Sequence, residues 1–200
     1  MASAAPQQRR AKNRLIVCNS ANDDNSVIAM HENTMTMLGI FTGDSVMVKG
    51  KKKKETVLVC VSDALCEEGN VMVNGGARKN LAVELGDVVS IHTCEAMYGT
   101  KVCILPFADS IEGVAGNLFE GWLKPYFSQS YRPVTVGDTF IVRRNMRAIE
   151  FKVTAVEVAA APAAGAVVSA GTAAHAQYCI VTPDTQIFCD GELEVLQAAL

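Results

Sequence analysis

The sequence lacks the short motifs that identify most nucleotide-dependent and hydrolytic enzymes. It has no G-x-x-x-x-G-K-[ST] phosphate-binding loop, so we expect no nucleotide hydrolysis by this chain. It also has no G-x-S-x-G, H-E-x-x-H or G-x-G-x-x-G. We therefore expect no catalytic residue and no cofactor in the chain itself.

Metal ligands and paired cysteines are scarce as well. The three histidines, His31, His92 and His175, are far apart, and the seven cysteines include no C-x-x-C. This spacing predicts no zinc site. An odd number of cysteines without a secretory signal indicates reduced, mostly buried thiols in a cytosolic or nuclear protein.

The sequence has no long apolar run and no strong positive charge. No stretch is long enough to span a bilayer, and residues 1–13 are polar and basic without the apolar segment of a signal peptide. The net charge is −3 and the pI is about 5.6. We expect a flexible N-terminal arm, no stable membrane insertion and no nucleic-acid partner.

What the sequence does contain is a repeated Gly-Asp pair. Gly43-Asp44, Gly86-Asp87 and Gly137-Asp138 each follow an apolar approach and precede an alternating apolar strand. Glycine permits a turn with positive φ, and the aspartate can cap nearby backbone N–H groups. Three such units predict a β-barrel of turn-strand repeats. No Asp-Thr/Ser-Gly string follows, so an aspartic-protease pair is excluded and the carboxylates are expected to cap turns.

Short strands recur as far as Pro106 and predict one compact barrel over residues 14–106. Strands at 45–49 and 55–61 form an expected hairpin that carries Lys51 to Lys54 at its tip. Two interpretations of the lysines are open: a solvated tip that discourages edge-to-edge strand pairing, or a patch for phosphate or nuclear localisation.

A polar connector at 107–116 separates this barrel from a second β subdomain over 117–192. Asn117 is the expected N-cap of a short helix that Pro125 ends. Trp122 in that helix is either an apolar anchor or a ligand platform. Residues 155–176 are about half alanine, which favours a mobile hairpin insertion. Residues 193–200 form a tail, helical or frayed.

Several strings, in this order along the chain, resemble one family. The match runs from about Asn13 to Glu192, and the strings are specific only in combination. The most specific strings are Gly116-Asn117-Leu118-Phe119-Glu120, Leu123-Lys124-Pro125-Tyr126-Phe127, Tyr131-Arg132-Pro133, Met146-Arg147-Ala148 and Tyr178-Cys179-Ile180-Val181. Through these strings the chain resembles the N-terminal domain of the valosin-containing protein family, the transitional endoplasmic reticulum AAA ATPases.

The resemblance implies a mainly β fold, a double-psi β-barrel followed by a smaller four-stranded β-barrel with a short helix. It implies a domain that recruits adaptors to a hexameric segregase, which extracts ubiquitinated clients for proteasomal and endoplasmic reticulum-associated degradation. The implied partners are ubiquitin-regulatory X (UBX) domains, the ubiquitin-fusion-degradation heterodimer, arginine-rich helical motifs and the protein's own ATPase domains. ATP and Mg²⁺ would belong to those domains. The isolated domain is expected to be a monomer, cytoplasmic with nuclear and endoplasmic reticulum-surface pools.

The resemblance also implies a groove between the subdomains, where a carboxylate beside tyrosines can hold an arginine. Phe41 has two open interpretations, a core residue or an adaptor contact. Arg143 and Arg147 are implied at the ATPase-ring interface, or are solvated turn residues. The implied groove residues are Asp24, Val27, Phe41, Gly43, Val59, Val61, Tyr98 and Tyr131.

Three positions depart from the family pattern. Thr42 stands where an arginine is usual, Arg144-Asn145 replaces Gly-Gly, and the alanine-rich insertion is longer than usual. The first removes a polar adaptor contact and the second leaves the shape of the turn open. An alternative function from a different class is a lipid- or polyanion-binding barrel that uses Lys51 to Lys54.

Overall fold

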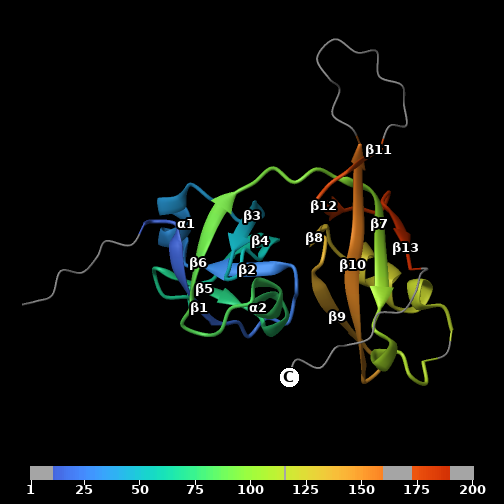
Figure 1. The fold of residues 1–200 in the computed structure, drawn as a ribbon. Coiled ribbons are helices and arrows are strands. Elements are labelled where there is room, and N and C mark those ends of the chain that lie inside the picture. Colours follow the sequence, from blue (N-terminus) through green and yellow to red (C-terminus); the bar gives the residue numbers. More distant parts are fainter. Residues whose placement is uncertain (1–10, 115, 160–172, 190–200) are drawn as a thin grey trace, which may run out of the picture.

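Six strands close into a barrel in the N-terminal half of the chain (Figure 1). A computed structural model describes residues 11–114, 116–159 and 173–189. Around the barrel the strands follow the order β1-β5-β2-β4-β3-β6, with β1–β5 and β2–β4 parallel and the other pairs antiparallel. The elements are β1 (Arg14–Asn19), β2 (Val27–Met30), α1 (Glu32–Leu38), β3 (Ser45–Lys49), β4 (Glu55–Ser62), β5 (Asn70–Val73), α2 (Gly75–Leu81) and β6 (Val88–Thr93).

A second β subdomain lies beside the barrel in Figure 1. Its larger sheet runs β11-β10-β7-β13, with β9 also paired to β10, and a smaller sheet pairs β8 with β12. The mainly β fold with a closed barrel and a second β subdomain is thus confirmed, but the described residues of the second subdomain form seven strands and not the four expected. Its elements are β7 (Gly99–Pro106), η1 (Ala108–Ser110), η2 (Phe119–Leu123), α3 (Lys124–Ser128), β8 (Arg132–Thr135), β9 (Thr139–Arg144), β10 (Arg147–Ala159), β11 (Ala173–His175), β12 (Tyr178–Val181) and β13 (Gln186–Phe188).

The strand β7 corrects the predicted extent of the first barrel. It pairs antiparallel with β10 and parallel with β13, so the strand before Pro106 belongs to the second sheet. The chain therefore passes between subdomains before Gly99 and not after Pro106. The periodicity of β7 predicts a strand but carries no information about which sheet receives it.

Each subdomain has its own apolar core. The barrel core is made of inward-facing side chains such as Leu15, Ile28, Val46 and Val71, and the second core contains Phe140, Phe151 and Trp122. Trp122 is 9% exposed, which identifies it as the expected apolar anchor. Burial of such side chains is the main stabilising contribution to each subdomain.

The three Gly-Asp units have the same backbone geometry. Their glycines have positive φ angles of 98°, 86° and 90°. In each unit the glycine N–H donates to a carbonyl of a residue on a neighbouring strand, whose own N–H donates to the aspartate carbonyl at 2.8–2.9 Å. The repeat therefore attaches each turn to an adjacent strand. The strand residues are Cys60 for Gly43-Asp44, Val17 for Gly86-Asp87 and Val153 for Gly137-Asp138.

The carboxylates of the first two units cap their turns as predicted. Asp44 Oδ2 accepts the Phe41 N–H at 2.8 Å, and Asp87 Oδ2 accepts the Glu84 N–H at 2.8 Å. The Glu84 N–H, followed by the Lys51 ammonium, holds the pKa of Asp87 below its usual value. For Asp138 the prediction was wrong, because its carboxylate accepts instead from the Thr56 hydroxyl across the subdomain boundary.

The lysine hairpin packs against the end of α2. Lys49 pairs with Glu55 in register, as the predicted hairpin requires, and the Lys51 N–H donates to the Leu81 carbonyl at 3.1 Å. Gly50 lies so close that a Cβ added there would be 2.1 Å from the Leu81 oxygen. Only glycine fits this contact without backbone movement.

We expect Gly50→Ala to lower the free energy of unfolding by about 3 kcal/mol, because the new methyl group displaces either the hairpin or α2. Gly121→Ala is the matched control, since a Cβ at Gly121 would meet nothing within 4 Å. Urea unfolding of both variants at one pH measures the difference. Equal stabilities would contradict the close packing.

The connecting helix differs from its prediction at its C-terminal end. Asn117 Oδ1 accepts the N–H groups of Phe119 at 2.8 Å and Glu120 at 3.2 Å, which confirms the N-cap. Pro125 does not end the helix: η2 is a π-helical turn, and α3 continues from it to Ser128 with the proline in its first turn. The proline removes one backbone donor where the π-helical turn passes into α3, and the helical segment continues across it.

Part of the alanine-rich stretch is regular strand. β10 continues to Ala159, and β11 pairs antiparallel with its end, Glu157 opposite His175. Residues 160–172 of the insertion predicted over 155–176, most of the arm at 1–13 and the tail at 193–200 lie outside the described residues. No helix in the described part of the chain is both long and apolar enough to cross a membrane.

Candidate functional site

The outer face of the barrel next to the second subdomain presents a row of valines. Val27 of β2 lies opposite Val59 of β4 in the parallel pairing, and Val61 follows two residues later on the same face. Because side chains alternate along a strand, Leu58 and Cys60 point into the barrel core. The valines Val27, Val59 and Val61 are only half-buried. They form an apolar floor that the molecule leaves partly open to solvent.

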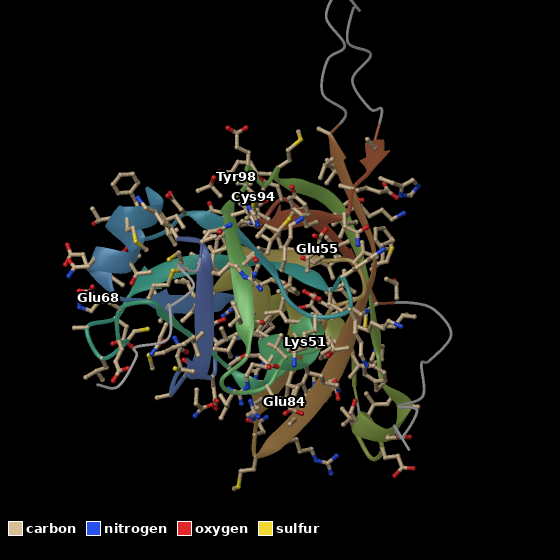
Figure 2. All side chains as sticks on the ribbon, turned by 60° about the vertical axis from the view of Figure 1, so that its left-hand side comes forward. Lys51, Glu55, Glu68, Glu84, Cys94 and Tyr98 are labelled. Carbon is tan, nitrogen blue, oxygen red and sulfur yellow. The ribbon has the colours of Figure 1, made fainter. Side chains whose placement is uncertain are left out.

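Two tyrosines stand next to each other beside the sheet of β8 and β12, and the backbone of Tyr98 is bridged to Ile180 of β12. Tyr98 is 67% exposed and Tyr131 is 64% exposed, and their ring centroids are 6.5 Å apart. Tyr98 precedes β7, where the Ile180 N–H donates to the Met97 carbonyl at 2.9 Å, and Tyr131 immediately precedes β8. Figure 2 labels Tyr98 in the upper part of the molecule. An exposed aromatic pair of this kind is typical of a binding surface.

Phe41 is also an exposed aromatic and does not belong to the core. The first Gly-Asp turn holds its backbone through Asp44, and its side chain is 74% exposed. Gly43 in the same turn is exposed too. The turn thus presents a large apolar side chain to solvent, at a cost that burial in a complex would recover.

Asp24 has a different environment from the one expected of it. Its Oδ1 accepts the Ser26 N–H at 2.9 Å and forms an ion pair with the guanidinium of Arg132. Arg132 is 8% exposed, donates from Nε to the Tyr126 carbonyl at 3.0 Å and lies 4.1 Å from the Tyr126 ring centre. An internal arginine therefore occupies the carboxylate expected to bind an arginine of a partner.

Further polar contacts join the two subdomains. The Asn80 side chain makes a matched pair of bonds to Thr139, donating to its carbonyl and accepting from its N–H at 2.9 Å each. Asn25 donates to the Ile141 carbonyl at 3.0 Å, and Lys79 pairs with Glu150 at 2.6 Å. These contacts hold β9 and β10 against the barrel, in addition to the Arg132–Asp24 pair that holds β8 next to Tyr131.

Arg143 and Arg147 lie on the β9–β10 hairpin. Arg143 is 3.9 Å from Asp23, and Arg147 donates to the Glu112 carbonyl at 3.1 Å. The chain still makes a tight turn where Arg144-Asn145 replaces Gly-Gly. Arg144 lies opposite Arg147 in the antiparallel strand pairing, and the two residues between them, Asn145 and Met146, have φ angles of 49° and 59°. Both angles suit a two-residue type I′ turn. The Met146 side chain is fully exposed.

An open cavity of about 480 Å³ lies beside the Asp24–Arg132 pair. Residues of both subdomains line it, among them Asp23, Trp122, Gln129 and Arg143. Within the described ranges no three histidine, cysteine or acidic side chains converge on a point that could hold a metal ion. The chemistry available here is recognition through aromatic, apolar and charged contacts.

Two of the side chains that shape this region were not predicted. Arg132 lies in the string Tyr131-Arg132-Pro133 but no local pattern gives it or Asn80 a function, because their partners are 108 and 59 residues away. A buried arginine directly after an exposed tyrosine is compatible with many local structures. Only the fold identifies its partner.

Two family models match the chain. The model of the N-terminal domain of cell division protein 48 (CDC48) matches residues 14–97, and the model of CDC48 domain 2 matches residues 114–192. The first match covers the closed barrel, and the second begins after β7 and covers the strands β8 to β13. Together the matches span most of the chain.

Proposed function

Because the chain belongs to the N-terminal region of the CDC48 family of AAA ATPases, we propose that it recruits adaptor proteins through the surface between its two subdomains. The proposed site comprises the apolar floor and the three exposed aromatics, Phe41, Tyr98 and Tyr131. The observation that carries the proposal is the Tyr98–Tyr131 pair, since the two rings lie next to each other beside the subdomain boundary and remain largely exposed. Aromatic side chains in such positions contribute most of the affinity in many interfaces.

The preferred partner chemistry follows from what surrounds these rings. The half-buried valines accept an apolar side chain, and the tyrosine rings accept the flat face of an arginine. Asp24 contributes through Arg132, by fixing the wall from which Tyr131 extends. This combination fits UBX domains, the ubiquitin-fusion-degradation heterodimer and short arginine-rich helices, the adaptor classes that the family resemblance implies.

The wider function follows from the family. We propose that the parent protein is a homohexameric ATPase that extracts ubiquitinated clients, including those of endoplasmic reticulum-associated degradation, and that ATP and Mg²⁺ bind outside this chain. Cytoplasmic, nuclear and endoplasmic reticulum-surface pools agree with such a function. Arg143 and Arg147 on the exposed β9–β10 hairpin are the residues that we propose to face the ATPase ring.

A UBX domain immobilised on resin tests the proposal. We expect capture of the chain with a dissociation constant in the micromolar range or tighter, and little change when Lys51 to Lys54 are replaced by glutamine. The reason is that the lysines lie at the tip of the β3–β4 hairpin, before β4 begins, whereas Val59 and Val61 lie in the second half of β4, and the Lys51 ammonium already pairs with Asp87 at 2.8 Å. Loss of binding in the lysine variant would instead favour the polyanion-binding alternative.

A further inference from the structure

Asp138 is the one aspartate of the three Gly-Asp units whose carboxylate leaves its own turn. It accepts a hydrogen bond from the hydroxyl of Thr56, at the beginning of β4 in the barrel. The Thr135 hydroxyl lies 3.5 Å from the same Thr56 oxygen and accepts the Val57 N–H at 3.2 Å. Thr56 and Thr135 are buried, at 3% and 2% exposure. A titratable group is thus built into the contact between β4 and β8.

The contact borders a small internal cavity of about 30 Å³ between the subdomains. Such a volume holds no more than one or two water molecules. Asn80, Tyr126 and Val153 also line it. Burial raises the pKa of Asp138 to about 7, although the Thr56 hydroxyl and the Lys54 ammonium act in the opposite direction.

Lys54 is the charged side chain that acts on the pKa of Asp138. The other titratable and charged groups on the elements around Asp138 are Glu55 of the β3–β4 hairpin, Lys79 of α2 with its partner Glu150, Lys152 of β10, Tyr126 of α3 and the Arg132–Asp24 pair at the other end of β8. Glu55 pairs with Lys49 at 3.1 Å.

The strand β8 transmits this contact to the candidate binding surface. It is fixed to the barrel at both ends, by Arg132 on Asp24 and by Thr135 on Val57. Tyr131 directly precedes β8, and Val59 lies two residues after Val57 on β4. The same two strands therefore carry both the buried carboxylate contact and two opposing parts of the surface.

We propose that Asp138 is a proton-dependent positioning residue, which tightens the packing of β8 on β4 when protonated and loosens it when ionised. The change in packing requires only the contact between β8 and β4. Its effect on adaptor binding rests on the proposed function.

The direction follows from linkage. Separation of β8 from β4 hydrates Asp138 and returns it toward its ordinary acidity, so the closed interface binds the proton more tightly than the open one. The closed form is favoured at pH 6 and loses this advantage as the pH rises through about 7. Neutral asparagine at this position keeps the interface closed at every pH.

Amide hydrogen exchange in the whole chain tests the proposal. Two amides report on the interface: Val57, which donates to Thr135, and Thr139, which donates to Asn80. We expect their protection factors, corrected for intrinsic exchange, to fall about tenfold between pH 6 and 8.5 and to stay constant in Asp138→Asn. The Val17 amide, bonded within the barrel, is the internal control.

A second variant tests the mechanism without changing the carboxyl group. Thr56→Val removes a hydrogen bond that favours the ionised form, so the pH midpoint is expected to move upward. The proposal is overturned if the wild-type protection factors are independent of pH. It is also overturned if the protection factors of Asp138→Asn still change with pH.

UBX binding measured at two pH values distinguishes a failure of this proposal from a failure of the proposed function. A UBX domain is expected to bind wild type several-fold more tightly at pH 6 than at pH 8.5, and Asp138→Asn equally at both. Absence of UBX binding at either pH would refute the proposed function and leave the exchange result to decide the proton-dependent contact. If the amide protection factors change with pH but UBX binding does not, the link between Asp138 and the adaptor-binding surface is refuted.

Discussion

Replacing Tyr131 by alanine is expected to weaken UBX binding by about 30-fold or more, which corresponds to a loss of about 2 kcal/mol. The side chain is 64% exposed and its ring centroid lies 6.5 Å from that of Tyr98, so its removal deletes contact area from the middle of the proposed surface. The fold should survive, because an exposed side chain contributes little to stability. Isothermal titration calorimetry with a UBX domain measures the change.

Leu65→Ala is the matched control for this prediction. Leu65 is 86% exposed, more than Tyr131, but it lies on the loop between β4 and β5. We expect its replacement to leave UBX affinity unchanged. Equal losses in the two variants would mean that the tyrosine acts through general surface hydrophobicity and not through a defined site.

Asp24→Ala is expected to lower the free energy of unfolding by about 3 kcal/mol. The change leaves the guanidinium of Arg132, which is 8% exposed, without its carboxylate partner. An uncompensated buried charge is far more costly than the loss of a surface ion pair. Urea unfolding monitored by circular dichroism gives the value.

The neighbouring Asp23→Ala provides the comparison. Asp23 has the same chemistry, but its side chain is 87% exposed and 3.9 Å from Arg143. Surface pairs of this kind contribute at most about 1 kcal/mol. A similar stability for both variants would contradict the anchoring function of Asp24. The contrast also implies that loss of adaptor binding in Asp24 variants has to be separated from loss of structure.

Local sequence patterns predicted the features of this protein that depend on local geometry. The Gly-Asp turns, the β3–β4 hairpin and the Asn117 cap each follow from a few adjacent residues, and the structure confirms them. Glycine adopts positive φ angles that few other residues adopt, and the side-chain oxygen of asparagine accepts the free N–H groups at the start of a helix. Such signals are readable without knowledge of the fold.

The features that depend on distant partners were missed or assigned wrongly. Asp138 was expected to cap its own turn but reaches Thr56, 82 residues earlier. Asp24 was expected to be available to a partner but binds Arg132, 108 residues later. The strand β7 was placed in the wrong subdomain for the same reason. Hydrophobic periodicity indicates that a residue is buried but does not indicate which residue covers it.

Exposure of the aromatic residues is the part of the candidate site that the sequence left open. Phe41, Tyr98 and Tyr131 had the same apolar character as core residues, and only their position next to turns indicated otherwise. In the structure all three are more than 60% exposed. Their use in adaptor recognition is a proposal that direct mapping can decide.

The most direct measurement is a titration of the isotope-labelled chain with a UBX domain, followed by backbone amide chemical shifts. We predict that the largest changes occur at Val27, Phe41, Val59, Tyr98 and Tyr131, with Leu65 and the lysines at 51–54 unaffected. Changes concentrated on those lysines or on the β9–β10 hairpin, with the aromatic surface unchanged, would contradict the proposed adaptor site.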